Sequence, residues 1–168
     1  MDNNSDIQPD TIHGDTGAQS EVVFAFAYLL AIKLMPRIRN FKHLKYYRPV
    51  TTHGNKFEHI DTLFTKDKID WALIEVHYYD MLRVVMSIQS GKIKASRILR
   101  KLSTQSRKNK IYQAFRELGR VIRTIFLLNY INDIELRRVI HAARGSLREG
   151  TKFPRTPLQR FASLGCSQ

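Results

Sequence analysis

The segment from His13 to Thr16 (HGDT) combines an imidazole and a carboxylate beside a glycine, just ahead of an apolar run. Carboxylates bind divalent cations, and both groups can exchange protons, so this segment could support either kind of chemistry. It follows a short hydrophobic stretch and precedes a predicted helix, which places Asp15 at the end of a strand or loop, facing a crevice. From the residues alone, however, Asp15 is more typical of a turn residue or a helix cap than of a ligand.

A second candidate site contains Glu75, His77 and Asp80 (EVHYYD), which resembles a metal-ligand or acid/base cluster. On a helix, at about 100° per residue, Glu75 and His77 point about 200° apart, so they cannot share one metal ion. The spacing therefore favours structural roles, and we expect Asp80 to pair with Arg83 on the same helix.

The elements that must position HGDT are a helix and a strand on its C-terminal side. The apolar run predicts a helix that begins at Ser20 and Glu21 and ends before Pro36. Residues 33–39 (KLMPRIR) predict a short strand, in which Pro36 requires an edge or a position whose N–H is not needed. Residues 1–11 are expected to form a flexible N-terminal segment, and residues 40–68 are expected to be mostly loop with brief regular structure.

Helices dominate the second half of the chain. A helical period from Asp70 ends at Gly91, a short helix is expected over 94–102, and another runs from Asn109 to Asn129. A last helix begins with a capping box of Asn132 and Glu135. The helix from Asp70 is expected to bury Trp71, Ile74, Tyr78, Leu82, Val85 and Ile88. The helix from Asn109 is expected to bury Tyr112, Phe115, Leu118, Ile122, Ile125 and Phe126, with Arg116, Arg120 and Arg123 on its opposite side. The last helix is expected to bury Leu136, Val139, Ile140 and Ala143. Four consecutive helices predict that the second half of the chain resembles a helical bundle.

Charge is unevenly distributed along the chain, which has 28 Lys and Arg against 15 Asp and Glu and a net charge of +13. Residues 1–32 contain no basic residue, and no acidic residue lies between Asp80 and Glu117. This balance is typical of proteins that bind nucleic acid, although a solvated basic face is the alternative. The candidate DNA-binding residues are Arg37, Arg39, Lys94, Arg97, Arg100, Lys101, Arg107, Lys108 and Lys110.

The composition predicts one soluble, cytoplasmic domain with no membrane partner. Of the 168 residues, 43% are apolar, enough for a core. The apolar run from Val22 to Ile32 is shorter than the ~18 residues that cross a bilayer, and no basic residue precedes Lys33, as a signal peptide would require. The single cysteine, Cys166, excludes an internal disulfide, and no Cys or His spacing offers a closed zinc site.

Several ordered blocks of the sequence resemble the Tn-three-family replicative transposases, around their second catalytic aspartate. The blocks are HGDT, VVFAFAYLL, MPRIRN, LKYYRP, SIQSGKIKASRILRKL and YQAFRELGRVIRTIFLLNYINDIELRR. The resemblance covers about Ile12 to Ala143. It implies an α/β, predominantly helical fold: a partial RNase-H-like core of the DDE type with a helical, bundle-like insertion.

The family chemistry is two-metal phosphodiester cleavage and strand transfer in DNA transposition, in which three carboxylates hold two divalent cations. The resemblance therefore implies that Asp15 is the second catalytic carboxylate and a Mg²⁺ ligand, although this fragment alone is not expected to bind the ion. It also implies that the partner is DNA, both transposon ends and target. It also implies a nucleoid-associated location. Within the family, the first carboxylate lies on an upstream strand that this sequence does not contain.

The third carboxylate departs from the family pattern. Where the family has an Asn-Lys-x-Glu motif, the sequence reads AARGSLREG, so Arg148 stands in the acid position and Glu149 is one residue late. Residues 12–143 are therefore interpreted as a truncated, inactive fragment of the catalytic domain, with residues 144–168 a divergent, disordered tail of the kind that a frameshift produces. An incomplete core would also promote self-association. The alternatives are a small, non-catalytic DNA- or RNA-binding protein and an unstable remnant without function.

Overall fold

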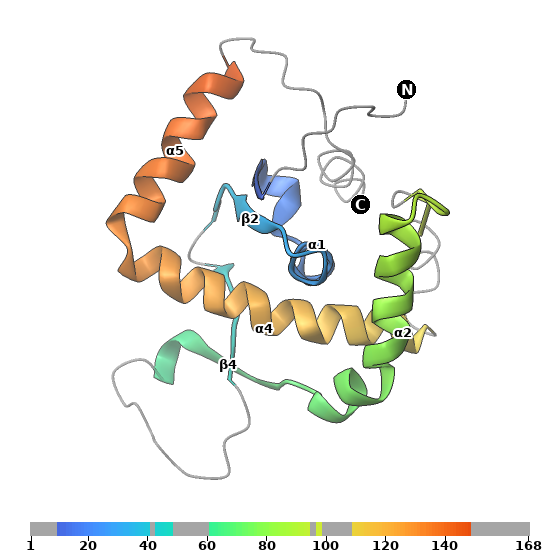
Figure 1. Cartoon of the computed structure of the whole chain (residues 1–168). Helices are drawn as coiled ribbons and strands as arrows, with labels where there is room; N and C mark the ends of the chain where they lie inside the picture. The colour runs from blue at the N-terminus through green and yellow to red at the C-terminus, as the bar shows by residue number, and fades with distance from the viewer. Residues whose placement is uncertain (1–9, 41–42, 49–60, 95–96, 99–108, 149–168) are drawn as a thin grey trace.

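The computed structural model describes residues 10–40, 43–48, 61–94, 97–98 and 109–148 (Figure 1). These ranges are mostly helical, with two small sheets. In chain order the elements are β1 (Thr11–Gly14), the short 3-10 helix η1 (Thr16–Gln19), α1 (Glu21–Leu29), β2 (Lys33–Pro36), β3 (Tyr46–Arg48), the 3-10 helix η3 (Asp61–Leu63), β4 (Phe64–Lys68), α2 (Trp71–Gln89), α4 (Lys110–Asn132) and α5 (Ile134–Arg148). The expected helix over 94–102 lies largely outside the described residues.

Strands β1 and β2 form a parallel pair that is connected by α1, and each strand has one partner among the described residues. The register places Ile12 opposite Leu34 and Gly14 opposite Pro36. Pro36 ends its strand, where its missing N–H costs no ladder bond, as the sequence predicted. Helix α1 begins as expected, because the Ser20 hydroxyl accepts a hydrogen bond from the Val23 N–H at 3.3 Å.

The core forms where α1 packs against α4, and α4 also contacts α2, β3 and α5. Six consecutive residues of α1, 22–27, are buried, so this helix is enclosed on all sides rather than along one stripe. Phe26 stacks on Phe115 of α4 with ring centroids 4.2 Å apart. Gly119 lets the two backbones meet: a Cβ built there would lie 1.7 Å from the carbonyl oxygen of Glu21.

Helix α2 begins and ends where the sequence predicted, but its buried face is different. The Asp70 side chain accepts from the Leu73 N–H at 3.0 Å, and Gly91 follows the helix with a φ of +69°, the left-handed conformation that glycine tolerates. The buried residues are Ile74, Met81 and Val85, whereas Trp71 and Tyr78, which were expected in the core, are exposed. The apolar side chains of α2 form a broad stripe, and the helical period alone did not show which edge of that stripe faces α4.

Three expectations about the last two helices are wrong. The residue that caps α5 is Asp133, which accepts from the Leu136 N–H at 3.0 Å, and not Asn132, which ends α4. Of the expected inner residues, Ile125 of α4 and Val139 of α5 are exposed, while Ile140 is buried. Helix α5 also continues to Arg148, beyond the point at Ala143 where the helical pattern was expected to end.

The described helices do not form the expected bundle. Figure 1 shows α2 standing across one end of α4 and α5 leading away from its other end, so neither helix runs beside α4. Helix α4 is therefore the central element on which α1, α2, α5 and β3 are assembled. In the described part of the chain, no helix is long and apolar enough to span a membrane.

Candidate functional site

Asp15 follows directly after β1, so it lies at the carboxyl end of a parallel strand, as the sequence predicted. Its backbone carbonyl accepts from the Ala18 N–H at 2.9 Å, which starts η1, but its side chain makes no capping bond to that helix. The carboxylate is exposed, and one of its oxygens accepts a hydrogen bond from the Thr16 hydroxyl at 3.2 Å. The carboxylate is therefore accessible to solvent and to an incoming ligand.

Arg37 lies beside Asp15 at the same edge, because it follows β2, the strand paired with β1. The Arg37 N–H donates to the Gly14 carbonyl at 2.9 Å, and the Arg37 carbonyl accepts from the Gln19 side chain. These two bonds fix the backbone after β2 to the turn that carries Asp15. The backbones that carry Asp15 and Arg37 are thus held side by side where two parallel strands end, which is the usual place for ligands in α/β proteins.

His13 does not join this pair. It lies within β1 opposite Met35, and its Nδ1 is buried without a hydrogen-bond partner among the described residues. Burial lowers the pKa of the His13 imidazole below its ordinary value, because the charged form loses its hydration. The half-buried His13 side chain therefore favours its neutral form and packs as part of the strand.

The described residues do not fit a complete metal site. No group of three or more His, Cys, Asp or Glu side chains that could hold a metal ion occurs in the ranges that the structure describes. Mg²⁺ takes about six oxygen ligands, and Asp15 supplies at most two of them. Glu149, the second acid that the sequence offered, lies outside the described residues. No catalytic step is therefore assigned to a metal on these residues.

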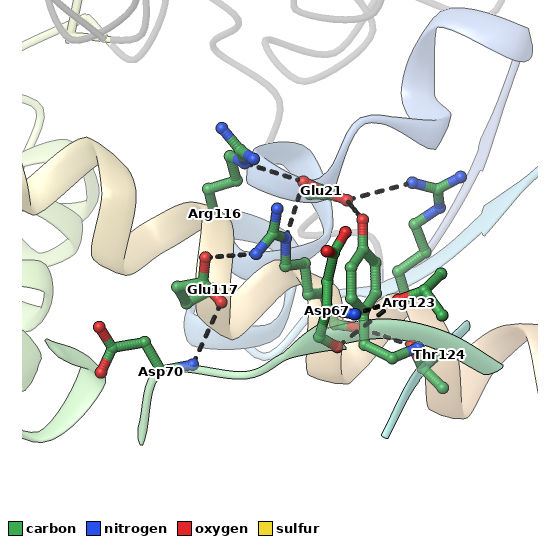
Figure 2. Close-up of polar contacts among 10 residues, drawn as sticks. Glu21, Asp67, Asp70, Arg116, Glu117, Arg123 and Thr124 are labelled. Atoms are coloured by element: carbon green, nitrogen blue, oxygen red, sulfur yellow. Dashed lines mark hydrogen bonds and ion pairs between the residues drawn. The ribbon is translucent and has the colours of Figure 1, made fainter. Parts of the chain in front are cut away.

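An ionic cluster that the sequence pattern did not reveal joins α1 to α4 (Figure 2). Glu21, the first residue of α1, lies 3.3 Å from Arg116, 3.6 Å from Arg120 and 3.6 Å from Arg123. The three arginines were expected on the outer side of α4; Arg120 and Arg123 are instead largely buried against α1. Their spacing of three and four residues did predict a common face, but only the fold shows that an acid lies opposite it.

The Glu21 cluster also reaches β3 and α2. The Tyr47 hydroxyl of β3 donates to Glu21 at 2.9 Å, and the Arg120 guanidinium lies 4.7 Å from the centre of the Tyr47 ring. Burial, followed by the Glu21 charge, raises the pKa of the Tyr47 hydroxyl. Arg120 pairs with Glu117 at 2.6 Å, and Glu117 accepts from the Asp70 backbone N–H at the start of α2. Four elements thus meet at one cluster.

The remaining sequence candidates are dispersed over the surface. Arg39, Lys94, Arg97 and Lys110 are exposed. Arg100, Lys101, Arg107 and Lys108 lie outside the described residues, so the acid-free interval is only partly described. The EVHYYD segment has the structural role that its spacing favoured: Asp80 contacts His77 at 3.4 Å and Arg83 at 3.3 Å, and Glu75 is exposed.

Comparison with known proteins identifies the family of this chain. The family model of the Tn3 transposase DDE domain matches residues 1–149. The chain therefore belongs to the Tn3 family of DDE transposases, and the match extends beyond the expected range of 12–143 on both sides. No solved structure matches the chain.

The curated relatives agree with this assignment. The chain is 37% identical over 160 residues to the transposase of transposon Tn501 from Pseudomonas aeruginosa, and 32% identical over 157 residues to that of Tn3926 from Escherichia coli. Each match covers 90% of this chain and 16% of the relative. The transposase of Tn1546 from Enterococcus faecium is 34% identical over 136 residues, 81% of this chain. The chain thus spans about one sixth of the length of these relatives.

Proposed function

We propose that this chain carries the second carboxylate of a two-metal DNA transposition site, and that Asp15 is that carboxylate. The observation that supports the proposal is the position of Asp15 at the carboxyl edge of β1 and β2, next to Arg37. Its side chain is exposed and makes no capping hydrogen bond to η1. In an RNase-H-like core, this edge gathers the acids that hold Mg²⁺, which activates the attacking oxygen and stabilises the leaving oxygen of the phosphodiester.

The chain's own residues have separate roles in this proposal. Asp15 supplies one ligand group and keeps it directed outward, because its side chain is not used to cap η1. Arg37 places a positive charge at the same edge, where a DNA phosphate approaches. Because the described residues supply a single candidate acid, we expect no detectable strand cleavage by this chain alone with Mg²⁺ or Mn²⁺. Nucleoid association and self-association stay predictions.

Grafting residues 12–143 into a complete relative tests the role of Asp15. In a Tn501 transposase that carries these residues in place of its own, Asp15→Asn should abolish transposition in cells. Asp80→Asn is the matched control, because Asp80 pairs with Arg83 on α2 and should retain the activity of the graft. An active graft that keeps its transposition frequency with Asp15→Asn would show that the catalytic acid lies elsewhere.

The alternative is a non-catalytic DNA-binding protein, in which the basic residues bind DNA and Asp15 has no functional role. It predicts that the wild-type chain and its Asp15→Asn variant bind duplex DNA equally well, with or without divalent cation. In the transposase proposal, by contrast, Asp15→Asn abolishes transposition by the graft and leaves DNA binding by the chain unchanged. Transposition by the graft, measured beside a DNA-binding titration of the chain, distinguishes the two functions.

A further inference from the structure

Helix α2 has a second apolar side, which lies at the surface of the chain. Three large apolar side chains on it are mostly exposed: Val76 by 73%, Tyr79 by 75% and Met86 by 64%. Figure 1 shows α2 at the edge of the molecule, across one end of α4. Large apolar patches that stay exposed on a folded chain mark contact sites for a partner. The outer side of α2 is therefore a candidate interaction surface.

The exposed side has the spacing of helices that pair with one another. Its five positions are separated by four, three, four and three residues and are Ala72, Val76, Tyr79, Arg83 and Met86. At about 100° per residue they lie within about 80° of one another, on the side of α2 away from its buried residues. This heptad spacing forms the seam along which two helices interlock their side chains. We call these five residues the α2 seam.

The charges of α2 favour a protein partner over nucleic acid. The helix has two acidic residues, Glu75 and Asp80, and one basic residue, Arg83, in a chain with a net charge of +13. Asp80 lies 3.3 Å from Arg83, so the cation of the α2 seam is paired with an acid. DNA and anionic membranes are bound through clusters of Lys and Arg. The α2 seam, with one paired arginine among apolar side chains, does not have this composition.

A second copy of this chain fits the α2 seam when the two helices run antiparallel. The heptad spacing then places Val76 of one copy opposite Met86 of the other, and Tyr79 opposite Arg83. The Arg83 side chain, which is 80% exposed, packs on the face of the opposite Tyr79 ring as a cation–π contact. Asp80 stays beside Arg83, so the guanidinium is not buried without an acid. In a parallel pair the two Arg83 side chains would instead face each other and repel.

We propose that the α2 seam is a dimer interface at which two copies of this chain pair antiparallel. Each residue of the seam contacts a residue of the same seam in the other copy, as a two-fold dimer requires. One helix face covers less than the ~800 Å² per partner of a standard stable interface, so the dimer is weak and forms at high protein concentration. The proposal is independent of the proposed function, because the Asp15 edge is built by β1 and β2 and not by α2.

Salt dependence distinguishes this dimer from association that is bridged by nucleic acid. Two copies of a chain with a net charge of +13 repel each other, and salt screens this repulsion. Dimerisation through the α2 seam should therefore strengthen as the salt concentration rises. Association through bound DNA or RNA weakens instead, because salt competes for the phosphates.

The test is sedimentation equilibrium of the full chain, free of nucleic acid, over a range of protein and salt concentrations. Tyr79→Ser removes one ring from each copy and should weaken dimerisation about tenfold or more. Tyr28→Ser is the matched control, because Tyr28 is an exposed tyrosine on α1 and should leave the dimer unchanged. Both side chains are exposed, so each variant should keep the melting temperature of the wild type at low protein concentration, which shows that it is folded.

Disulfide cross-linking tests the orientation of the pair, in chains that also carry Cys166→Ser. An antiparallel pair brings position 76 of one copy next to position 86 of the other. A mixture of Val76→Cys and Met86→Cys chains should therefore cross-link under mild oxidation, and neither variant should cross-link alone. A parallel pair would instead cross-link each variant with itself.

Several results would overturn the proposal, and all of them leave the proposal for Asp15 unaffected. A chain that stays monomeric at high protein and salt concentration has no such interface. A dimer that weakens as salt rises, or that Tyr79→Ser leaves unchanged, uses another surface. Cross-linking of either cysteine variant with itself, or none in the mixture, would exclude the antiparallel pair.

Discussion

Replacement of Gly119 by alanine tests how closely α1 and α4 are packed. The added Cβ would lie 1.7 Å from the Glu21 carbonyl oxygen and 2.3 Å from its carbonyl carbon. Normal contact requires more than 3 Å, so one helix must move by more than 1 Å. The obstacle is backbone, which cannot rotate away as a flexible side chain can.

The expected magnitude follows from two opposing terms. Overpacking of this kind costs about 3 kcal/mol, the upper part of the usual range, because neither helix backbone yields. Alanine favours the helix over glycine by about 1 kcal/mol. The net loss in the free energy of unfolding is about 2 kcal/mol, which lowers the melting temperature of a chain of this size by about 4–8 °C.

Urea unfolding, followed by circular dichroism, measures this loss. Gly91→Ala is the control: its φ of +69° is unfavourable for alanine, but no atom lies within 4 Å of the added Cβ. It should cost about 1 kcal/mol through backbone strain alone. A Gly119→Ala variant as stable as the wild type would refute the close approach of the two helices.

Three further predictions concern single polar groups, each measured by urea unfolding. Glu21→Gln should lower the free energy of unfolding by about 2 kcal/mol, because it leaves partly buried guanidinium groups without their acid. Glu135→Gln, at a highly exposed ion pair, should lower it by less than about 0.5 kcal/mol, and equal losses for the two variants would contradict this prediction. Because the pKa of the Tyr47 hydroxyl is raised in the folded chain, its contribution to stability is present below pH ~10 and is lost as the pH rises further, so Tyr47→Phe should flatten the alkaline decline. Asp70→Ala removes the cap on the Leu73 N–H and should cost about 1 kcal/mol, and an unchanged midpoint would exclude a capping role.

Local signals predicted where three of the helices begin. The helix starts at Ser20, Asp70 and Asn109 were predicted, and each of these residues caps its helix, because a cap acts within three residues of itself. The cap of α5 was misplaced by one residue because Asn132 and Asp133 are both suitable caps, and only the bend after α4 selects the second. The strand with Pro36 and the exposed Asp15 after β1 were also predictable.

Long-range pairings were not predictable from the sequence. The three arginines of α4 could be grouped from their spacing, but a charge pattern cannot show that Glu21 lies opposite them. Trp71 and Tyr78 belong to a stripe that satisfies the helical period, and their exposure depends on where α4 crosses α2. At the candidate site, Asp15 was identified by resemblance, while its proximity to Arg37 follows from the parallel register of β1 and β2.

The packing of α1 on α4 has a consequence for synthesis of the chain. Glu21 and Gly119, which meet at this contact, are roughly 100 residues apart. At a translation rate of ~5–20 residues per second, α1 waits about 5–20 s for its partner to be made. Its six consecutive buried residues have no cover from α4 during that interval. Folding is therefore expected to begin late, after α4 leaves the ribosome, and the yield of native chain should depend on chaperones that bind α1 in the meantime.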